Sequence, residues 1–471
     1  MGVHDLTQGS VIKSLFKLSI PIVMANFLQT AYQLTDTFWV GRLGTNAIAS
    51  LSLSFPVIFL LISMGAGFAV SGTILVSQYT GQKNTKMVSK VCLHTLFIIL
   101  ITSAILAGIA YAVIPYVIRA MTPTVEIQNI TISYLRISFI GLIFSYLYMM
   151  FQSLYRGVGD VKTPFYIVLF SVVLNFIIDP ILIMGYGPIK AYGVDGAAYA
   201  TICTQGLSAV IGLYLLAKGK GGIKIDFTKI SFDFSLAKKI IHLGFPASTE
   251  QSSRAMAMMV MTFLIATFGD IALAAYGIGI RVLTLMIIPS LGFAMATSTL
   301  VGQNIGAGKI ERTKEVTSKA LWVIFIALSI AGVGFFIFAE QTLQIFVPNE
   351  IAVINEGANF IRIIALTFGL IGVQQVASGA MRGGGSPMIS MMVAIVSLWV
   401  IRFPIAYVLS KHTPLGQTGI YLSFVVGNIL GASIAIFIIK QNRWIKNLTD
   451  PITEEERKVI EETIVEDGVI S

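Results

Sequence analysis

Long apolar runs alternate with short polar connections along the whole chain. Each run has about 20 residues or more, enough for an α-helix to cross a hydrocarbon core about 30 Å thick. The pattern predicts an all-α integral membrane protein with twelve transmembrane helices. Their predicted ranges are 14–38, 52–78, 92–117, 132–155, 164–186, 196–217, 239–267, 273–302, 317–338, 357–380, 388–409 and 419–439.

The composition supports a membrane location. Of the 471 residues, 55% are hydrophobic and 12% are charged, and the mean hydropathy is +0.83. Soluble domains carry about 25% charged residues. Most of the chain is therefore expected to lie within a lipid bilayer.

The chain has a formal net charge of +9, and most of its basic residues lie in the connections between the apolar runs. Basic residues gather near both ends of the chain and on alternate connections. They are Lys13, Lys17, Lys83, Lys86, Lys90, Lys218, Lys220, Lys224, Lys229, Lys238, Lys239, Lys309, Arg312, Lys314, Lys319, Lys440, Arg443 and Lys446. Cytoplasmic loops carry an excess of Lys and Arg, so both termini are predicted to be cytoplasmic. This distribution reflects topology, and we expect no nucleic-acid partner.

The chain repeats itself. LSIP ends at Pro21 and LGFP at Pro246, and VSQYTG ends at Gly81 as VGQNIG ends at Gly306, both at a spacing of 225 residues. Because each repeat has an even number of helices, two six-helix lobes related by a pseudo-two-fold axis along the membrane normal are predicted. The predicted domains are an amino-terminal lobe (1–217), a basic cytoplasmic linker (218–238), a carboxy-terminal lobe (239–440) and a charged cytoplasmic tail (441–471).

The two halves differ in their intramembrane carboxylates. Asp36 aligns with Met261 and Asp179 with Phe403, so only the first half carries them. A charged Asp at the centre of a membrane helix costs about 2.5–3.5 kcal/mol and usually faces a cavity or a bundle interior. These two residues are therefore candidates for a functional site.

Polar neighbours accompany both carboxylates. Asn175 lies four residues before Asp179, and Tyr32 four before Asp36, so each pair shares a helix face. Pro180 removes a backbone donor and is expected to kink its helix. Carboxylate, amide and hydroxyl oxygens suit a proton, Na⁺ or a hydrated cation rather than a transition metal. The alternative is that the carboxylates only satisfy buried donors or lie in water near the interface.

Other charged residues in the predicted spans have structural interpretations. Glu250 and Arg254, four residues apart in the seventh span, are expected to form a local ion pair. Arg382 is interpreted as a topology anchor beside a cytoplasmic loop. Arg281 and Arg402 are interpreted as side chains that snorkel to the outer interface.

The order of the motifs resembles one transporter family. LSIP, LQTAYQLTDTFWVGRLG, YRGVGDVKTP, LNFIIDPILI and GVDGAAYAT resemble the multidrug and toxic compound extrusion (MATE) family, and LGFPASTEQ and LVGQNIGAGK resemble its second lobe. The resemblance covers residues 12–440. Within this family, the chain most resembles the DinF-like branch, whose polar site lies in the amino-terminal lobe.

The resemblance implies a set of site residues. Asp36 corresponds to the first-helix carboxylate, and Asn175 and Asp179 to the NxxxDP motif. Thr201 corresponds to a sixth-helix hydroxyl and Tyr134 to a fourth-helix tyrosine. The candidate cation-coupling and substrate-binding residues are Asp36, Asp179, Asn175, Thr201, Tyr134 and Tyr32, of which Asp36, Asn175, Asp179 and Thr201 would be metal ligands if Na⁺ is the coupling ion.

The chain departs from the family pattern in two places. Some members have an acidic residue where this chain has Val158. Members linked to Na⁺ also use a carboxylate deep in the seventh helix, and Glu250, four residues after Pro246, is expected to lie too shallow to match it. We therefore expect coupling through the first lobe.

These observations favour a secondary active antiporter that exports amphipathic, often cationic organic compounds in exchange for H⁺ or Na⁺. The alternative is a flippase for lipids or lipid-linked sugars of the same superfamily. Such a flippase should line its cleft with several basic residues, and the predicted spans contain few. The expected partners are small-molecule substrates and the lipid bilayer, and the expected location is the plasma membrane, as a monomer.

An enzyme is not expected. Gly157–Asp160 reads as the GxGD signature of intramembrane aspartyl proteases, which need two facing carboxylates. However, Asp160 sits in a basic loop outside the predicted spans, and its counterpart in the repeat is Ser386. No nucleotide-binding motif is present. Cys92 and Cys203 have neither a CxxC partner nor metal-type neighbours, so we expect no cofactor other than the coupling ion.

Overall fold

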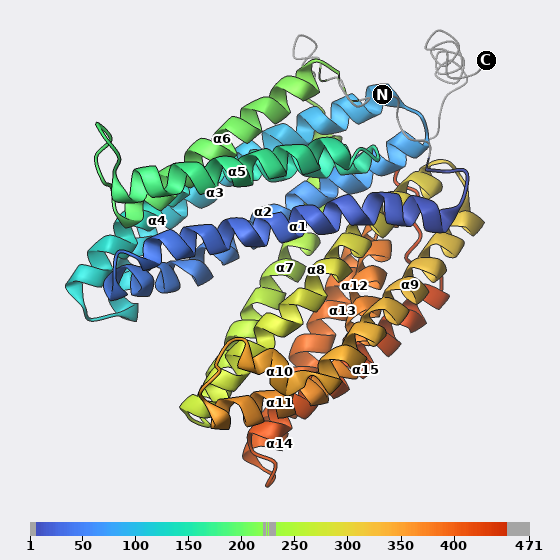
Figure 1. The fold of residues 1–471 in the computed structure, drawn as a ribbon. Coiled ribbons are helices and arrows are strands. Elements are labelled where there is room, and N and C mark those ends of the chain that lie inside the picture. The colour runs from blue at the N-terminus through green and yellow to red at the C-terminus, as the bar shows by residue number, and fades with distance from the viewer. Residues whose placement is uncertain (1–5, 220–222, 224, 226–231, 450–471) are drawn as a thin grey trace.

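The computed structural model describes residues 6–219, 223, 225 and 232–449, and the regular elements in these ranges are helices (Figure 1). Within them, extended residues pair only at an isolated bridge between Tyr186 and Ile189. The predicted all-α fold is confirmed.

Six long helices form the amino-terminal lobe. They are α1 (Val11–Gly41), α2 (Thr45–Gly81), α3 (Thr85–Met121), α4 (Val125–Gly157), α5 (Lys162–Met184) and α6 (Val194–Ala217). Helix α4 packs against α2, α3 and α6, and α5 packs against α1 and α6. These contacts place α4 and α5 on different sides of the interior of the lobe.

The carboxy-terminal lobe has more breaks in its helices. Its elements are α7 (Phe234–Ala266), α8 (Asp270–Gly306), α9 (Ile310–Ile337), α10 (Ala339–Gln344), α11 (Ile351–Ala365), α12 (Phe368–Gly383), α13 (Pro387–Ile395), the π-helical turn η1 (Val396–Arg402), α14 (Phe403–Lys411) and α15 (Gln417–Lys440). Helices α11 and α12 meet at a bend of 54°. The π-helical turn comes just before Pro404, whose missing backbone donor disfavours a regular α-helix there.

The number of spans agrees with the sequence pattern. Ten helices in the described residues are long and apolar enough to cross a membrane, and the bent pair α11 and α12 makes an eleventh. Helix α7 has 33 residues but includes Lys238, Lys239, Glu250 and Arg254, which make it more polar. With α7 the count reaches the predicted twelve.

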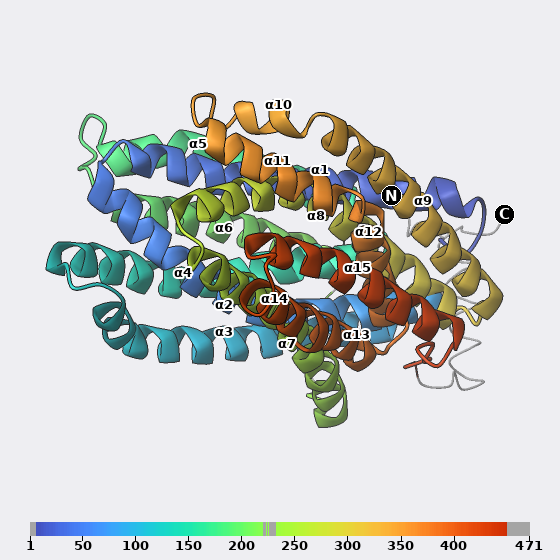
Figure 2. The same cartoon turned by 90° about the horizontal axis from the view of Figure 1, so that it is seen from below.

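The two lobes meet near the chain termini and diverge toward the opposite end (Figure 1). Most contacts between them join α1 and α2 to α7 and α8, and α8 lies near the middle of the molecule when it is viewed from below (Figure 2). The packing at the ends of α2 and α8 is very close, since a Cβ atom on Gly81 would lie 1.9 Å from the carbonyl oxygen of Gln303. A Cβ atom on Gly306 would lie 1.8 Å from the carbonyl oxygen of Gln78. Both positions therefore require glycine.

Two glutamines at equivalent positions of the repeat join the lobes. Gln78 Nε2 donates to the carbonyl of Gly383 at 3.1 Å, and Gln303 Nε2 donates to the carbonyl of Gly157 at 2.9 Å. Gly157 and Gly383 are the last residues of α4 and α12, where backbone carbonyls have no partner within the helix. We call these two reciprocal hydrogen bonds the glutamine clamp.

Both terminal segments also lie at this junction. Lys309 Nζ donates to the carbonyl of Thr7 at 3.0 Å, so the start of the chain contacts the connection between α8 and α9. The backbone N–H of Leu448 donates to Gln78 Oε1 at 2.8 Å, and Trp444 is fully buried. Residues 441–449, which were assigned to a charged tail, thus pack where the lobes meet. The remaining tail, 450–471, lies outside the described residues.

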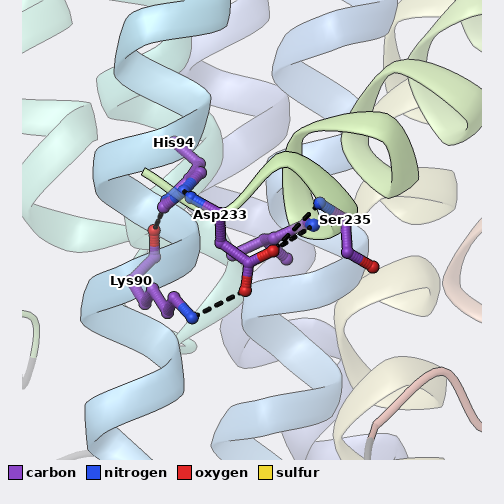
Figure 3. Close-up of polar contacts among 5 residues, drawn as sticks. Lys90, His94, Asp233 and Ser235 are labelled. Atoms are coloured by element: carbon purple, nitrogen blue, oxygen red, sulfur yellow. Dashed lines mark hydrogen bonds and ion pairs between the residues drawn. The ribbon is translucent and has the colours of Figure 1, made fainter. Parts of the chain in front are cut away.

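The predicted linker is only partly described, because 220–222, 224 and 226–231 fall outside the described ranges. Its end is anchored where Asp233 caps α7 and accepts a hydrogen bond from Lys90 Nζ at 2.7 Å (Figure 3). Helix α7 begins at Phe234, five residues earlier than the apolar pattern predicted.

Candidate functional site

The interior of the amino-terminal lobe contains Asp36 from α1 and Asp179 from α5. Asn175 Nδ2 donates to Asp179 Oδ1 at 2.9 Å, and both residues are fully buried. Four residues along an α-helix bring side chains to one face, which is how this pair forms. Helix α5 continues through Pro180 to Met184.

Asp36 faces this pair from the neighbouring helix. Its carboxylate interacts with Asp179, Asn175 and Thr201. Asp36 Oδ1, Asp179 Oδ2 and Asn175 Oδ1 are buried and have no hydrogen-bond partner among the described residues. Buried polar atoms are normally paired, so these three oxygens are available to a proton or a cation.

The chemistry of the three oxygens fits a small cation. Two carboxylates in a medium of low dielectric repel each other, which favours a proton or a cation between them. Carboxylate and amide oxygens are hard ligands, so Na⁺ is also compatible. Among the described residues no three His, Cys, Asp or Glu side chains cluster as transition-metal ligands would.

A hydroxyl pair extends the site toward α6. Tyr32 Oη and Thr204 Oγ1 are 2.7 Å apart, and Thr204 Oγ1 also donates to the carbonyl of Ala200 at 2.9 Å. Because a threonine hydroxyl has one proton, Tyr32 is the donor to Thr204. Thr204 was not among the sequence candidates, although it lies three residues after Thr201 and so shares its helix face.

Tyr134 lies on α4, a further helix of the same lobe. It is buried, and the charges of Asp36 and Asp179 act on it. It makes no hydrogen bond with either carboxylate in the described structure. The residues of the predicted set thus come from α1, α4, α5 and α6.

The carboxy-terminal lobe also holds a buried carboxylate, Glu250. Glu250 lies near the middle of α7, because α7 begins early, and it is fully buried. Glu250 Oε1 lies 2.9 Å from Arg254 Nη2, so these two residues form the local ion pair that the sequence predicted. The same oxygen lies 3.6 Å from Arg382 Nη1. Ser390 Oγ donates to Glu250 Oε2 at 2.7 Å. Arg382 is therefore not a surface anchor but a buried partner of Glu250.

Arg402 also departs from its interpretation. It was expected to snorkel outward, but Arg402 Nη2 donates to Asn428 Oδ1 at 2.7 Å and its guanidinium lies over the ring of Phe424 at 4.7 Å. The π-helical turn that ends at Arg402 directs the side chain toward α15. Arg402, like Arg382, is thus engaged with residues of its own lobe.

Asp160 of the GxGD sequence has a local role. Its Oδ1 accepts the backbone N–H of Lys162 at 3.1 Å and that of Thr163 at 3.0 Å. These are the first amides of α5, which otherwise lack partners. The side chain stabilises a helix start.

Two lobes of membrane-crossing helices around buried polar groups define a multi-pass membrane transporter. A model of the MatE family matches residues 21–181 and 246–408, one segment in each repeat and together more than half of the chain. The chain therefore belongs to the MatE family, as its motifs implied. Members of this family are transporters rather than enzymes.

Curated relatives match along almost the whole chain. The probable multidrug resistance protein YoeA of Bacillus subtilis is 29% identical over 422 residues, covering 89% of this chain and 91% of that protein. The probable multidrug resistance protein NorM of Thermotoga maritima is 26% identical, covering 92% and 93%. An FAD transporter of Shewanella oneidensis is 24% identical, covering 93% and 96%.

Solved structures share the fold. An outward-facing multidrug resistance MATE transporter superimposes with a TM-score of 0.88 at 25% identity, covering 94% of this chain and 98% of that one. A MATE transporter in a bent conformation gives 0.87 at 25% identity, covering 98% of both chains. The twelve-helix, two-lobe architecture is that of MATE transporters.

Proposed function

We propose that this protein is a secondary active antiporter that exports amphipathic, often cationic organic compounds in exchange for H⁺ or Na⁺. The observation that carries the proposal is the group of three orphaned oxygens on Asp36, Asp179 and Asn175, inside one lobe. A buried carboxylate pair without a fixed counter-ion is suited to gain and lose a cation during each cycle.

The site residues have complementary roles in this proposal. Asp36 and Asp179 bind the cation, Asn175 orients Asp179, and Thr201 supplies a further oxygen. The hydrogen bond from Tyr32 to Thr204 holds α1 against α6, so occupation of the site changes how these helices pack. Tyr134 closes the α4 side. When Na⁺ is the coupling ion, its ligands are Asp36, Asn175, Asp179 and Thr201.

Rocking of the lobes completes the cycle. The lobes diverge at the end away from the termini and are held together at the terminal end by the glutamine clamp. We assign the terminal end to the cytoplasm, because Lys309, Arg312 and Lys446 lie there. The structure then corresponds to an outward-open state, in a protein of the plasma membrane that acts as a monomer.

The cargo follows from the family and from the charges. The relatives named as multidrug resistance proteins support export of varied organic compounds. Inward movement of one positive charge supplies about 2.3 kcal/mol per 100 mV, enough to drive concentration gradients. A flippase is less favoured, because Arg382 and Arg402 are engaged with Glu250 and Asn428 rather than lining an open basic cleft. No cofactor is required.

Transport in liposomes tests the proposal. Efflux of a fluorescent organic cation is measured under a pH gradient and then under a Na⁺ gradient for the wild type, Asp36→Asn and Asp179→Asn. Glu126→Gln is the control, since Glu126 is an exposed carboxylate at the start of α4. We expect both Asp variants to lose coupling while Glu126→Gln retains it, and the effective gradient identifies the ion. Wild-type coupling in both Asp variants would show that the pair is structural.

A further inference from the structure

A polar cavity of about 470 Å³ lies between α3, α4 and α6 of the amino-terminal lobe. Its polar lining includes Tyr111 of α3, Ser133 and Arg136 of α4, and Asp195 and Tyr199 of α6. Asp195 belongs to the GVDGAAYAT motif, and the proposed transport site does not use it. The cavity therefore needs its own explanation.

The cavity opens away from the transport site. Ile132, Arg136 and Ile140 recur every four residues and lie on one face of α4. Tyr134, which is buried and near the carboxylates, projects about 200° around the helix from Arg136. Ile140 is 60% exposed. In a membrane this face of the lobe contacts lipid, so a ligand in the cavity would come from the bilayer rather than from the cleft between the lobes.

The cavity also lies near one membrane surface. Asp195 is the second residue of α6, and Tyr192 just before this helix is exposed. Tyr111 and Tyr199 line the cavity with rings that are 42% and 39% exposed. Tyrosines of this kind gather at the boundary between lipid and water, where headgroups lie.

Two opposite charges in the cavity lack ionic partners. The guanidinium of Arg136 lies over the ring of Tyr111 at 4.8 Å and makes no ion pair or hydrogen bond with the described residues. Asp195 Oδ2 accepts a hydrogen bond from Ser133 Oγ at 2.6 Å, but Asp195 Oδ1 has no partner there. Arg136 and Asp195 share the cavity without forming an ion pair, which leaves one donor group and one acceptor group for a ligand.

We propose that this cavity binds the headgroup of a phospholipid that carries a primary amine. The guanidinium of Arg136 donates to the phosphate, a pairing that its planar array of N–H groups favours. The ammonium group donates to the carboxylate of Asp195. A trimethylammonium headgroup has no N–H to donate, so phosphatidylethanolamine fits better than phosphatidylcholine. The site goes beyond the proposed transport function and does not depend on it.

Native mass spectrometry of the detergent-solubilised full chain tests the site. Retention of phosphatidylethanolamine, phosphatidylcholine and phosphatidylglycerol with identical acyl chains is compared for wild type, Arg136→Gln and Asp195→Asn. We expect wild type to retain phosphatidylethanolamine best. Arg136→Gln should weaken retention of all three lipids about tenfold, as for loss of a charge-assisted hydrogen bond. Asp195→Asn should remove only the preference for phosphatidylethanolamine.

Matched variants and a soluble competitor sharpen the result. Arg119→Gln and Glu126→Gln change exposed charges in the same part of the lobe outside the cavity, and they should retain lipid like wild type. Arg136→Lys keeps the positive charge, so it should retain more lipid than Arg136→Gln. Thermal unfolding of each variant checks that it is folded. Unchanged lipid retention in folded Arg136→Gln would overturn the proposed site. If glycerophosphoethanolamine, which has no acyl chains, displaces the bound lipid as well as intact phosphatidylethanolamine does, the assignment to a membrane lipid is overturned.

Discussion

Glu250 is one buried carboxylate that contacts two arginines, the half-buried Arg254 and the buried Arg382. Its Oε1 lies 2.9 Å from Arg254 and 3.6 Å from Arg382, and it has no exposed surface. Removing one member of a buried ion pair leaves an uncompensated charge, which costs about 3–5 kcal/mol. We expect Glu250→Gln to lower the unfolding temperature of the detergent-solubilised protein strongly.

Glu315→Gln is the control for this prediction. Glu315 pairs with Lys319 at 2.6 Å at an exposed position, where solvent screens the two charges and such a pair contributes little to stability. Similar small losses of unfolding temperature in both variants would mean that water reaches the cluster around Glu250 and compensates the arginines.

The sequence reveals those residue contacts that are local. Asn175 and Asp179 are four residues apart, so their hydrogen bond could be predicted from helix periodicity alone. The contact of Arg382 with Glu250 joins residues 132 positions apart in sequence and depends on how α12 packs beside α7. The contact of Tyr32 with Thr204 likewise depends on the packing of α1 against α6. Periodicity carries no information on such pairings.

At the scale of elements, the start of α7 depends on Asp233 (Figure 3). Asp233 Oδ1 accepts the backbone N–H groups of Ser235 at 2.9 Å and Leu236 at 3.2 Å, and Lys90 Nζ donates to Oδ2. Its own backbone N–H donates to Nε2 of buried His94 at 2.7 Å. Hydrophobic periodicity could not place this start, because Lys238 and Lys239 interrupt the apolar run and the start is set by the cap and by contact with α3.

The pH dependence of this anchor follows from its charges. The hydrogen bond from Lys90, followed by that from the Leu236 N–H, holds the pKa of Asp233 below its ordinary value. A lowered pKa means that the stabilisation is present above the unfolded value of about 3.9 and is lost as the pH falls through the folded pKa. We expect Asp233→Asn to unfold at a lower temperature than wild type at pH 7, with the difference shrinking below pH about 4.

Asp233→Ala separates the cap from the ion pair. Asparagine can still cap a helix whereas alanine cannot, so Asp233→Ala should cost about 1 kcal/mol more than Asp233→Asn. The ion pair itself is largely exposed and contributes at most about 1 kcal/mol. Equal unfolding temperatures for the two variants would show that the cap contributes nothing to the start of α7.

At the scale of the whole molecule, the glycines at the ends of α2 and α8 fix how closely the lobes approach. An alanine at Gly81 or Gly306 would place a Cβ atom within 2 Å of a backbone carbonyl oxygen of the other lobe. Backbone cannot move aside like a flexible side chain, so the lobes must separate there. We expect Gly81→Ala and Gly306→Ala to shift the protein away from the state described here.

Spin labels at Met121 and Ile351, exposed positions at the diverging end, report this shift as a shorter distance between the lobes. Gly334→Ala is the control, since no atom lies within 4 Å of a Cβ at that position. An unchanged distance distribution in Gly81→Ala would indicate that the junction relaxes without moving the lobes. The sequence predicted two lobes from its repeat, but it could not predict this contact, which arises only when the repeats face each other.

The reciprocity of the glutamine clamp has a consequence for the kinetics of the cycle. Each hydrogen bond alone contributes about 0.5–1.5 kcal/mol, so either one breaks readily. While the second hydrogen bond remains intact, the glutamine of the broken bond stays close to the carbonyl that it had bound. Its effective concentration there is high, so the broken bond re-forms. The clamp is thus a bivalent attachment whose two ends must be free at the same moment, so the lobes separate in one cooperative step rather than by gradual loosening.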